Sequence, residues 1–455
     1  MRASAGEWTR RGVMGVLGAA AVGALVMPGR RSGRAARDDS ARRRVAIRYW
    51  EKWTGAEGEA IQRVVDGFNG SQDRVWVERV PISDIVSKAM VAIGGGDPPD
   101  VVGLYSYNVP LFAEAGALVA LDGMPGGGEL AGRYAPAVAR LLSHEGRQWA
   151  GVNTCYTLAL YYNKRHFAEA GIERPPRTVE ELDAASERLT VRDRSGRIER
   201  AGFMQSLPFW WPYVWPVVFG GRLYDAERNL ATLKEPGSIA AYEWVSRTAG
   251  RLGREESRRF ATGFAGTYHS AADPFLSGRV SMIAQGPWIA NFARRSAPEL
   301  EYGCVPLPTG GGVREAAGES PVGLLEADVI AIPRGCPHPE AAWEFVRYTQ
   351  RAEVQEALAR EHCKSSPMRE VSEGFARGHA NAYVGVHDRV AKSERVQVLP
   401  QTRAWQQYSD LTAGAFDAIW SGEDVTETLG RLNRRAQEVL DQARRLRAMR
   451  QGARA

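Results

Sequence analysis

The chain has 455 residues, 44% of them hydrophobic and 25% charged. This is the composition of a globular protein with at least two lobes, because a single core stops growing at about 250 to 300 residues. The formal net charge is +6, but residues 1–44 hold ten arginines against three acidic residues, which leaves −1 for the rest. A basic surface for nucleic acid is therefore not implied.

Residues 1–44 are predicted to be a leader. Arg10 and Arg11 precede an apolar run, Gly12 to Met27, of 16 residues rich in Gly and Ala. The pattern resembles a twin-arginine export signal, and the run is short for a membrane span, which needs about 20 apolar residues. The alternative is an N-terminal anchor that stays in place. We expect a periplasmic or other extracytoplasmic protein.

From Val45 onward, predicted strands alternate with predicted helices. This alternation predicts an α/β lobe with a largely parallel sheet, in which ligands gather at the carboxyl ends of the strands. The expected segments are a strand at 45–50, an amphipathic helix at 57–69, a strand at 75–82, a helix at 84–93 and a strand at 100–105.

The pattern changes in the second part of the chain, where an apolar run through Tyr162 leads into a helix. A Trp-dense block at 209–225 precedes helical segments to about residue 295. Further expected segments are a helix at 178–189, strands at 302–311 and 327–335, a helix at 338–350 with Pro339 in its first turn, and a terminal helix from about Val425.

Four cysteines lie too far apart for a CxxC motif: Cys155, Cys304, Cys336 and Cys363. An oxidising compartment permits disulfides, but their pairing cannot be read from the sequence. We expect these cysteines to be structural and buried.

The order of these segments resembles the extracellular solute-binding proteins of ABC importers, specifically the sugar-binding, maltose-binding-protein-like group. Eleven stretches between about residues 45 and 430 follow the order of that family. They are YWEKWTG, GGGDPPDVV, FAEAGALVALD, ALYYNKRHFAEAGI, PPRTVEEL, FGGRLYD, FLSGRVSMIAQGPWIANF, YGCVPLPTGGG, ADVIAIPRG, PEAAWEFVRY and SGEDVTETL.

The resemblance implies a periplasmic-binding-protein-like fold of two α/β lobes with a ligand cleft and a hinge. It places the chain's crossings between lobes near residues 156–160, near 306–309 and around 360. The expected division is 45–157 plus 308–360 for lobe 1, and 158–307 plus 361–455 for lobe 2 and the C-terminal helices. The implied protein is a monomer without a cofactor that captures a sugar or oligosaccharide and delivers it to a membrane permease.

A sugar site needs planar aromatic rings for the C–H face and short polar groups for the hydroxyls. Trp288 falls on the Trp of the family's GPW motif, which stacks on the sugar. Tyr107 and Asn108 match hydroxyl-binding positions that are charged in the family. The Gly- and Pro-rich stretch 94–99 lets the next strand present them together with Tyr105.

Other candidates follow from the same correspondence. Tyr156, beside Asn153, falls where the family has an acidic ligand residue, and this departure leaves the identity of the sugar open. Trp210 and Trp211 lie on the wall before the FGG turn, whereas Trp215 is expected in the core.

The first strand end offers Trp50 and Glu51. Glu51 is expected to accept hydroxyl hydrogen bonds as a buried carboxylate, and the alternative is an exposed charge. Trp405 approximates the family's second stacking Trp, and Gly323 matches a turn that brings the backbone close to the ligand.

The sequence lacks the signatures of an enzyme: it has no HExxH, GxSxG or P-loop motif and no metal-spaced His or Cys cluster. A glycosidase needs two facing carboxylates, and no such pair can be argued from the sequence. The competing hypothesis is a two-lobe binder of a non-sugar solute, such as a phosphate-containing polyol ester. The aromatic and mostly neutral wall favours a neutral sugar.

Overall fold

The computed structural model describes residues 44–268, 270–313 and 320–452. Residues 44–455 form one compact unit. Residues 1–43 of the predicted leader, including Arg10 and Arg11, lie outside the described residues.

The first sheet has the strand order β13-β12-β3-β1-β2, with β6 paired to β12. Its strands are β1 (Val45–Glu51), β2 (Val75–Pro81), β3 (Val101–Tyr105), β6 (Gly151–Thr157), β12 (Gly323–Ala331) and β13 (Val396–Val398). The pairs β1–β2, β1–β3 and β12–β13 are parallel, whereas β12 is antiparallel to both β3 and β6. The expectation of a largely parallel sheet is therefore wrong at β12. This strand follows the residues of the second sheet in sequence and is not connected to its neighbours by a βαβ crossover.

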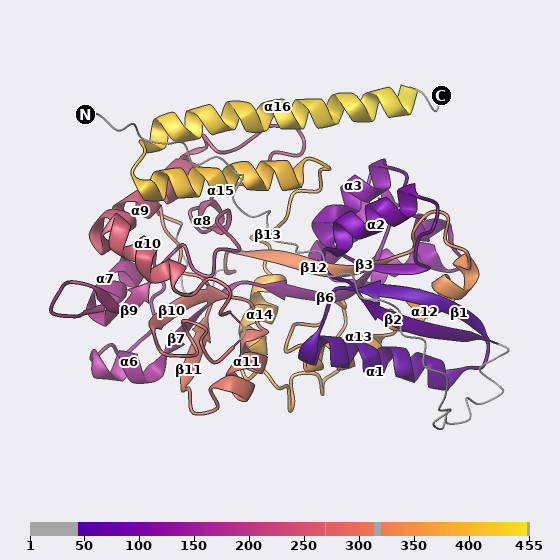
Figure 1. The fold of residues 1–455 in the computed structure, drawn as a ribbon, viewed down its shortest axis with the longest axis horizontal. Helices are drawn as coiled ribbons and strands as arrows, with labels where there is room; N and C mark the ends of the chain where they lie inside the picture. The colour runs from indigo at the N-terminus through magenta and orange to yellow at the C-terminus, as the bar shows by residue number, and fades with distance from the viewer. Residues whose placement is uncertain (1–43, 269, 314–319, 453–455) are drawn as a thin grey trace, which may run out of the picture. The chain divides into compact units, whose positions relative to one another are not determined.

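Helices cover this sheet, as Figure 1 shows for α1 and α2. The α1 side chains Ile61, Val65 and Phe68 recur on one face and are buried, as the period of an amphipathic helix predicts. The helices around this sheet are α1 (Gly55–Ser71), α2 (Ile85–Gly94), α3 (Val109–Glu114), α4 (Leu130–Arg133), α5 (Pro136–Leu142), α12 (Pro339–Thr349) and α13 (Ala352–Glu361). A short hairpin of β4 (Ser143–His144) and β5 (Arg147–Gln148) follows α5.

The second sheet has the order β11-β7-β10-β9-β8. Its strands are β7 (Ala159–Asn163), β8 (Val191–Arg192), β9 (Ile198–Phe203), β10 (Val280–Gln285) and β11 (Tyr302–Val305). The chain passes from the first sheet into the second at Leu158, between β6 and β7. The remaining helices are α6 (Lys164–Glu169), α7 (Val179–Leu189), α8 (Val214–Val218), α9 (Pro236–Leu252), α10 (Arg254–Thr262), α11 (Ile289–Ser296), α14 (Val384–Ala391), α15 (Trp405–Ser421) and α16 (Val425–Gly452).

Each sheet has its own large hydrophobic core, so the fold consists of two α/β lobes. We call the lobe around the first sheet the first lobe and the other the second lobe. The predicted boundaries assign residues 361–455 to the second lobe, but β13 pairs with β12 in the first sheet. The chain therefore returns to the first lobe before α15, and this part of the predicted division is wrong. The other boundaries stay a prediction.

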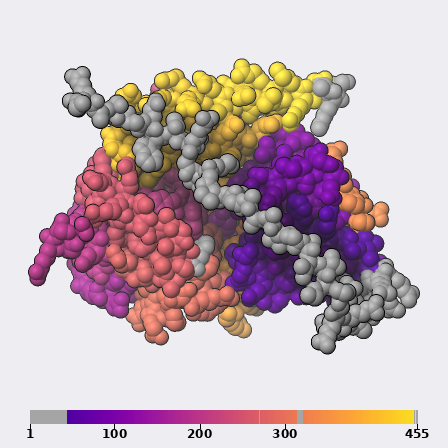
Figure 2. All heavy atoms as spheres, viewed as in Figure 1, coloured from indigo at the N-terminus to yellow at the C-terminus, as the bar shows by residue number. Residues whose placement is uncertain are grey.

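The last helix, α16, contacts both lobes. In its first part, the Gln437 side chain donates to the Asn229 carbonyl of the second lobe at 2.9 Å. Near its end, Arg447 forms an ion pair with Glu145 in the hairpin after α5, and Arg450 donates to the Glu114 carbonyl of α3. Figure 2 shows the yellow atoms of α16 next to purple atoms of the first lobe.

All four cysteines are free thiols, and Cys155, Cys304 and Cys363 are buried. The expectation of structural burial is confirmed for these three, and Cys336 is partly exposed. Among the helices that the structure describes, none has the length and apolar character of a membrane span.

Candidate binding site

The candidate site begins where β6 and β12 lie side by side. Asp328 on β12 stands opposite Thr154 of β6 and opposite Tyr105 of β3, and Glu326 stands opposite Tyr156. Because residues two apart on a strand point to one face, Glu326 and Asp328 both project toward the same side of the sheet. This register gathers polar and aromatic side chains from three strands.

Glu51, at the end of β1, is fully buried at 0% exposure. Its Oε2 accepts hydrogen bonds from the Tyr49 hydroxyl at 2.5 Å and from Asn153 Nδ2 at 3.1 Å, and its Oε1 accepts one from the Lys52 backbone N–H at 2.7 Å. The carboxylate fills the space above Gly103, where an added Cβ would lie 2.0 Å from Oε2. Protein donors therefore bind both carboxylate oxygens, and Glu51 fixes the strand end.

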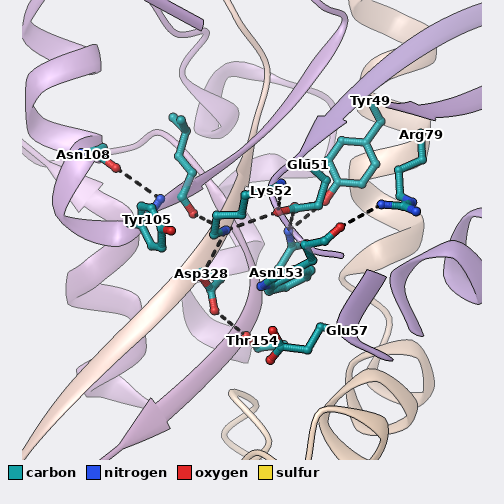
Figure 3. A network of polar contacts seen from close by, with 12 residues as sticks. Tyr49, Glu51, Lys52, Glu57, Arg79, Tyr105, Asn108, Asn153, Thr154 and Asp328 are labelled. Atoms are coloured by element: carbon teal, nitrogen blue, oxygen red, sulfur yellow. Dashed lines mark hydrogen bonds and ion pairs between the residues drawn. The ribbon is translucent and has the colours of Figure 1, made fainter. Parts of the chain in front are cut away.

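A chain of alternating charges continues from Glu51, as Figure 3 shows for its first members. Lys52 Nζ lies 3.3 Å from Glu51 Oε1 and 3.1 Å from Asp328 Oδ1. Lys364 Nζ lies 3.2 Å from Asp328 Oδ2 and 3.4 Å from Glu57 Oε1. Thr154 Oγ1 donates to Asp328 Oδ2 at 2.9 Å. Each buried charge thus has an opposite charge beside it, as buried ions require.

The pKa values of this network follow from two opposed causes. Burial alone raises the pKa of the Asp328 carboxyl, but Lys52 and Lys364 lower it well below its usual range. Burial alone lowers the pKa of Lys52, but Asp328 and Glu51 raise it above its ordinary value. Asp328 is therefore a carboxylate and Lys52 an ammonium group at neutral pH.

Aromatic rings enclose the two ammonium groups. Lys52 Nζ lies 4.6 Å from the centre of the Tyr105 ring and 4.8 Å from that of Trp53. Lys364 Nζ lies 5.3, 5.5 and 5.6 Å from the rings of Trp53, Tyr156 and Trp288. These are cation–π distances, and they join the charged network to the aromatic side chains of the second lobe.

Trp288 lies at the start of α11 and belongs to the aromatic rings that the second lobe contributes. Its ring meets Tyr156 edge-on at 4.8 Å and lies 5.8 Å from the ring of Trp211. The indole folds back over Gly286, where an added Cβ would lie 2.2 Å from the ring. The Trp288 side chain is 9% exposed, and among the described residues its Nε1 has no hydrogen-bond partner.

Glu326 joins the two lobes. The Tyr156 hydroxyl donates to its Oε2 at 2.5 Å, and the Tyr213 hydroxyl, from the segment before α8, donates to its Oε1 at 3.2 Å. Burial raises the pKa of Glu326 to about 7, although both tyrosine hydrogen bonds favour the ionised form. We give the name aromatic cluster to Tyr156 and Tyr213, which bind Glu326, together with Trp288, which packs on Tyr156, and Trp211, which packs on Trp288.

Residues 52–356 match the model of the family described as bacterial extracellular solute-binding protein. The chain belongs to this family. A putative binding protein of Brucella abortus is 22% identical over 400 residues, which cover 85% of this chain and 90% of that protein. The diacetylchitobiose binding protein of Streptomyces coelicolor is 22% identical over 306 residues, 66% of this chain and 67% of that protein.

The solved structure of CpMnBP1 with mannobiose bound has a TM-score of 0.75 to this solute-binding protein at 22% identity. The match covers 86% of this chain and all of that one. The likeness shows that the two lobes share the fold of that protein.

The structure of this solute-binding protein brings some predicted site residues together. Asn153, Tyr156, Trp211 and Trp288 lie in or beside the charged network and the aromatic cluster. Tyr105 and Tyr107 stack in parallel at 5.3 Å beside Lys52. Trp210 is 37% exposed and packs on Trp211 and Tyr268.

Other predicted residues have structural contacts instead. Trp405 is 2% exposed and packs in the second core between Tyr408 and Tyr213. The side-chain oxygen of Asn108, Oδ1, accepts a hydrogen bond from the Tyr105 backbone N–H at 3.3 Å and so caps the short turn after β3. Trp50 lies on the opposite face of β1 from Glu51 and packs on the first core.

Gly323, at the start of β12, is a close-packing position, because an added Cβ would lie 2.3 Å from Val390. Sequence reasoning did not assign Glu326, Asp328 or Lys364 to the site. Glu326 and Asp328 are two acidic residues on one face of an otherwise apolar strand, and this pattern could have indicated that they belong to a site. Lys364 follows α13 in a segment without a local pattern.

Proposed function

We propose that this solute-binding protein captures a neutral sugar or oligosaccharide outside the cytoplasm and delivers it to the membrane permease of an ABC importer. The observation that carries this proposal is the aromatic cluster, in which tyrosine hydroxyls from both lobes bind one buried carboxyl and the Trp288 ring packs on one of these tyrosines. Flat rings bind the C–H face of a sugar, and carboxyl and hydroxyl groups bind its rim. The names of the diacetylchitobiose binding protein and the mannobiose-bound CpMnBP1 support a sugar ligand.

The proposed mechanism is capture by closure. Tyr156 and Glu326 belong to the first sheet, whereas Tyr213, Trp211 and Trp288 belong to the second lobe. A ligand that contacts both groups favours the closed arrangement over an open one, because only the closed arrangement offers both sets of contacts. The closed lobes then present a joint surface to the permease.

No bond of the ligand needs to change in this mechanism. Glu326 and Asp328 are the carboxyl groups nearest to a glycosidase pair, but Asp328 is bound by Lys52, Lys364 and Thr154. A carboxylate held by three protein groups is a poor nucleophile or base for a substrate. We therefore propose a binding protein without catalytic activity, acting as a monomer.

Isothermal titration tests the ligand class with mannobiose, maltose, diacetylchitobiose and glycerol 3-phosphate. We expect at least one sugar to bind, and Trp288→Ala to weaken that binding by at least about 0.5 to 1.5 kcal/mol, the scale of a lost aromatic stack. Trp50→Ala, on the opposite face of β1, is the matched control and should leave the affinity unchanged. Binding of glycerol 3-phosphate without binding of any sugar would overturn the proposal in favour of a phosphate-containing polyol ester.

We further propose that the leader exports the protein through a twin-arginine-type signal. The paired Arg10 and Arg11 before the apolar run support this route. Replacing both with Lys should shift the protein from the extracytoplasmic to the cytoplasmic cell fraction. An unchanged distribution would exclude this signal.

A further inference from the structure

The strand β2 forms one edge of the first sheet. The sheet order ends at β2, which pairs with β1 and with no second strand among the described residues. The Arg74 carbonyl, just before β2, accepts a hydrogen bond from the Val45 N–H of β1 at 2.8 Å. Because successive residues of a strand present their backbone groups to opposite edges, the N–H and C=O groups of Val75 and Val77 point to the free edge.

Two side-chain amides from the end of α1 occupy this free edge. Asn69 Nδ2 donates to the Val77 carbonyl at 2.9 Å, and Asn69 Oδ1 accepts a hydrogen bond from the Val77 N–H at 2.8 Å. Gln72 Nε2 donates to the Val75 carbonyl at 2.8 Å, and Gln72 Oε1 accepts a hydrogen bond from the Val75 N–H at 2.8 Å. Each amide thus binds both backbone groups of one residue, as a facing residue of an antiparallel strand does.

The packing of α1 holds these amides against β2. Phe68, one residue before Asn69, is buried in the first core. Asn69 is 6% exposed and Val77 is 2% exposed, so their two hydrogen bonds are shielded from water. Gln72, just after the helix, is half-buried.

The amides cover the part of β2 that is most suitable for pairing with another strand. Its first three residues, Val75 to Val77, carry no charge and are of types that favour strands, and Trp76 is 44% exposed. Charges follow only at Glu78 and Arg79, and the one proline of β2 is its last residue. An edge with free backbone groups and an exposed apolar side chain is a template for another chain.

We propose that Asn69 and Gln72 keep this solute-binding protein monomeric by occupying the free edge of β2, which without them pairs with β2 of a second copy. The new pair is antiparallel, because a two-fold axis brings the same strand of both copies together in opposite directions. This inference rests on the part of the proposed function that makes the protein a monomer.

The competing explanation is that the two amides only fix the turn between α1 and β2. Their removal then lowers the stability of the protein but creates no contact with a second copy. The two explanations therefore differ in the mass of the particle and in how that mass depends on protein concentration.

The test replaces both residues in the full chain with apolar side chains of similar size, Asn69→Leu together with Gln72→Met. Sedimentation velocity at increasing protein concentration measures the mass. We expect wild type to keep the mass of one chain and the double variant to reach twice that mass. Gln62→Met is the matched control and should stay monomeric, because Gln62 lies on the same helix but its side chain binds Asp66 and Arg79.

A third substitution separates edge pairing from general unfolding. Trp76→Lys, added to the double variant, places a charge on the exposed edge without restoring the lost hydrogen bonds, and should return the protein to one chain. Hydrogen exchange at the Val75 and Val77 amides should be fast in the double variant at low concentration and slow at high concentration. Should the double variant not fold, Gln72→Met alone keeps the buried Asn69 bonds and should show weaker association.

Variants that stay monomeric at every concentration would overturn this inference while the proposed function stands. Association that Trp76→Lys does not reverse would also overturn it, since the contact would then lie elsewhere. A wild type that is itself a dimer would overturn both this inference and the proposed monomer.

Discussion

Glu326 makes the stability of the protein depend on pH in a direction opposite to most carboxyl groups. The carboxyl is buried between the Tyr156 and Tyr213 hydroxyls, and burial raises its pKa from 4.5 to about 7. Because the folded state then binds a proton that the unfolded chain has released, the contribution of Glu326 is most favourable below pH 4.5. That contribution is lost as the pH rises through about 7.

The magnitude follows from the shift. One pKa unit corresponds to about 1.36 kcal/mol. Raising the pKa of Glu326 from 4.5 to about 7 therefore makes its contribution to the free energy of unfolding about 3 kcal/mol smaller at pH 7.5 than at pH 4.5. The perturbation is Glu326→Gln, which cannot ionise and keeps an oxygen for one tyrosine. The other tyrosine hydroxyl can rotate to accept from the new amide N–H.

The assay is urea unfolding of both proteins at pH 5, 6, 7 and 8. We expect wild type to lose stability relative to Glu326→Gln across this range, because only wild type must hold a buried charge at high pH. Other titrating groups, including the buried histidines, cancel in the difference between the two proteins when they lie far from the substitution. A difference that stays constant with pH would refute the reasoning.

Two further substitutions test the buried network. Lys364→Met leaves Asp328 with one cation instead of two. Because breaking a buried ion pair costs about 3 to 5 kcal/mol, we expect the free energy of unfolding, measured in urea, to fall by that amount. A loss below about 1 kcal/mol would mean that Asp328 is solvated. Gly103→Ala should cost at least about 1 to 3 kcal/mol in Tm-derived stability, because its Cβ would overlap the Glu51 carboxylate. Gly128→Ala, with open space around it, is the control, and an equal loss in both variants would contradict the close approach.

Much of the fold could be predicted from the sequence because the first lobe has strong local patterns. The strand at 45–50 and the helix at 57–69 appear within two residues as β1 and α1, and the terminal helix begins at Val425 as expected. In these segments the apolar residues recur with the period of a strand or of a helix, and this local pattern is sufficient to predict the secondary structure. The sheet order could not be predicted, because β12 pairs with β3 across more than 200 residues of intervening sequence.

The candidate site was only partly predictable, because burial of a ring depends on contacts between distant segments. Trp288 and Trp405 have the same chemistry in the sequence, but Trp288 meets Tyr156 of the other lobe whereas Trp405 packs inside its own core. Glu51 was correctly placed at a strand end, but its Oε2 is bound by Tyr49 and Asn153 and its Oε1 by the Lys52 backbone N–H. Only the folded register reveals those donors.

The position of β12 in the first sheet has a consequence for the growing chain. On the ribosome, β3 lacks the neighbour on one of its sides until residue 331 has been made, which is 226 residues after Tyr105. At about 5 to 20 residues per second, this apolar strand edge waits for roughly 10 to 45 seconds. All five strands of the second sheet lie between residues 159 and 305, so they are synthesised first as a complete set. An unpaired edge of this kind invites wrong pairing with other chains, and completion of the first sheet therefore has to wait until β12 has been translated.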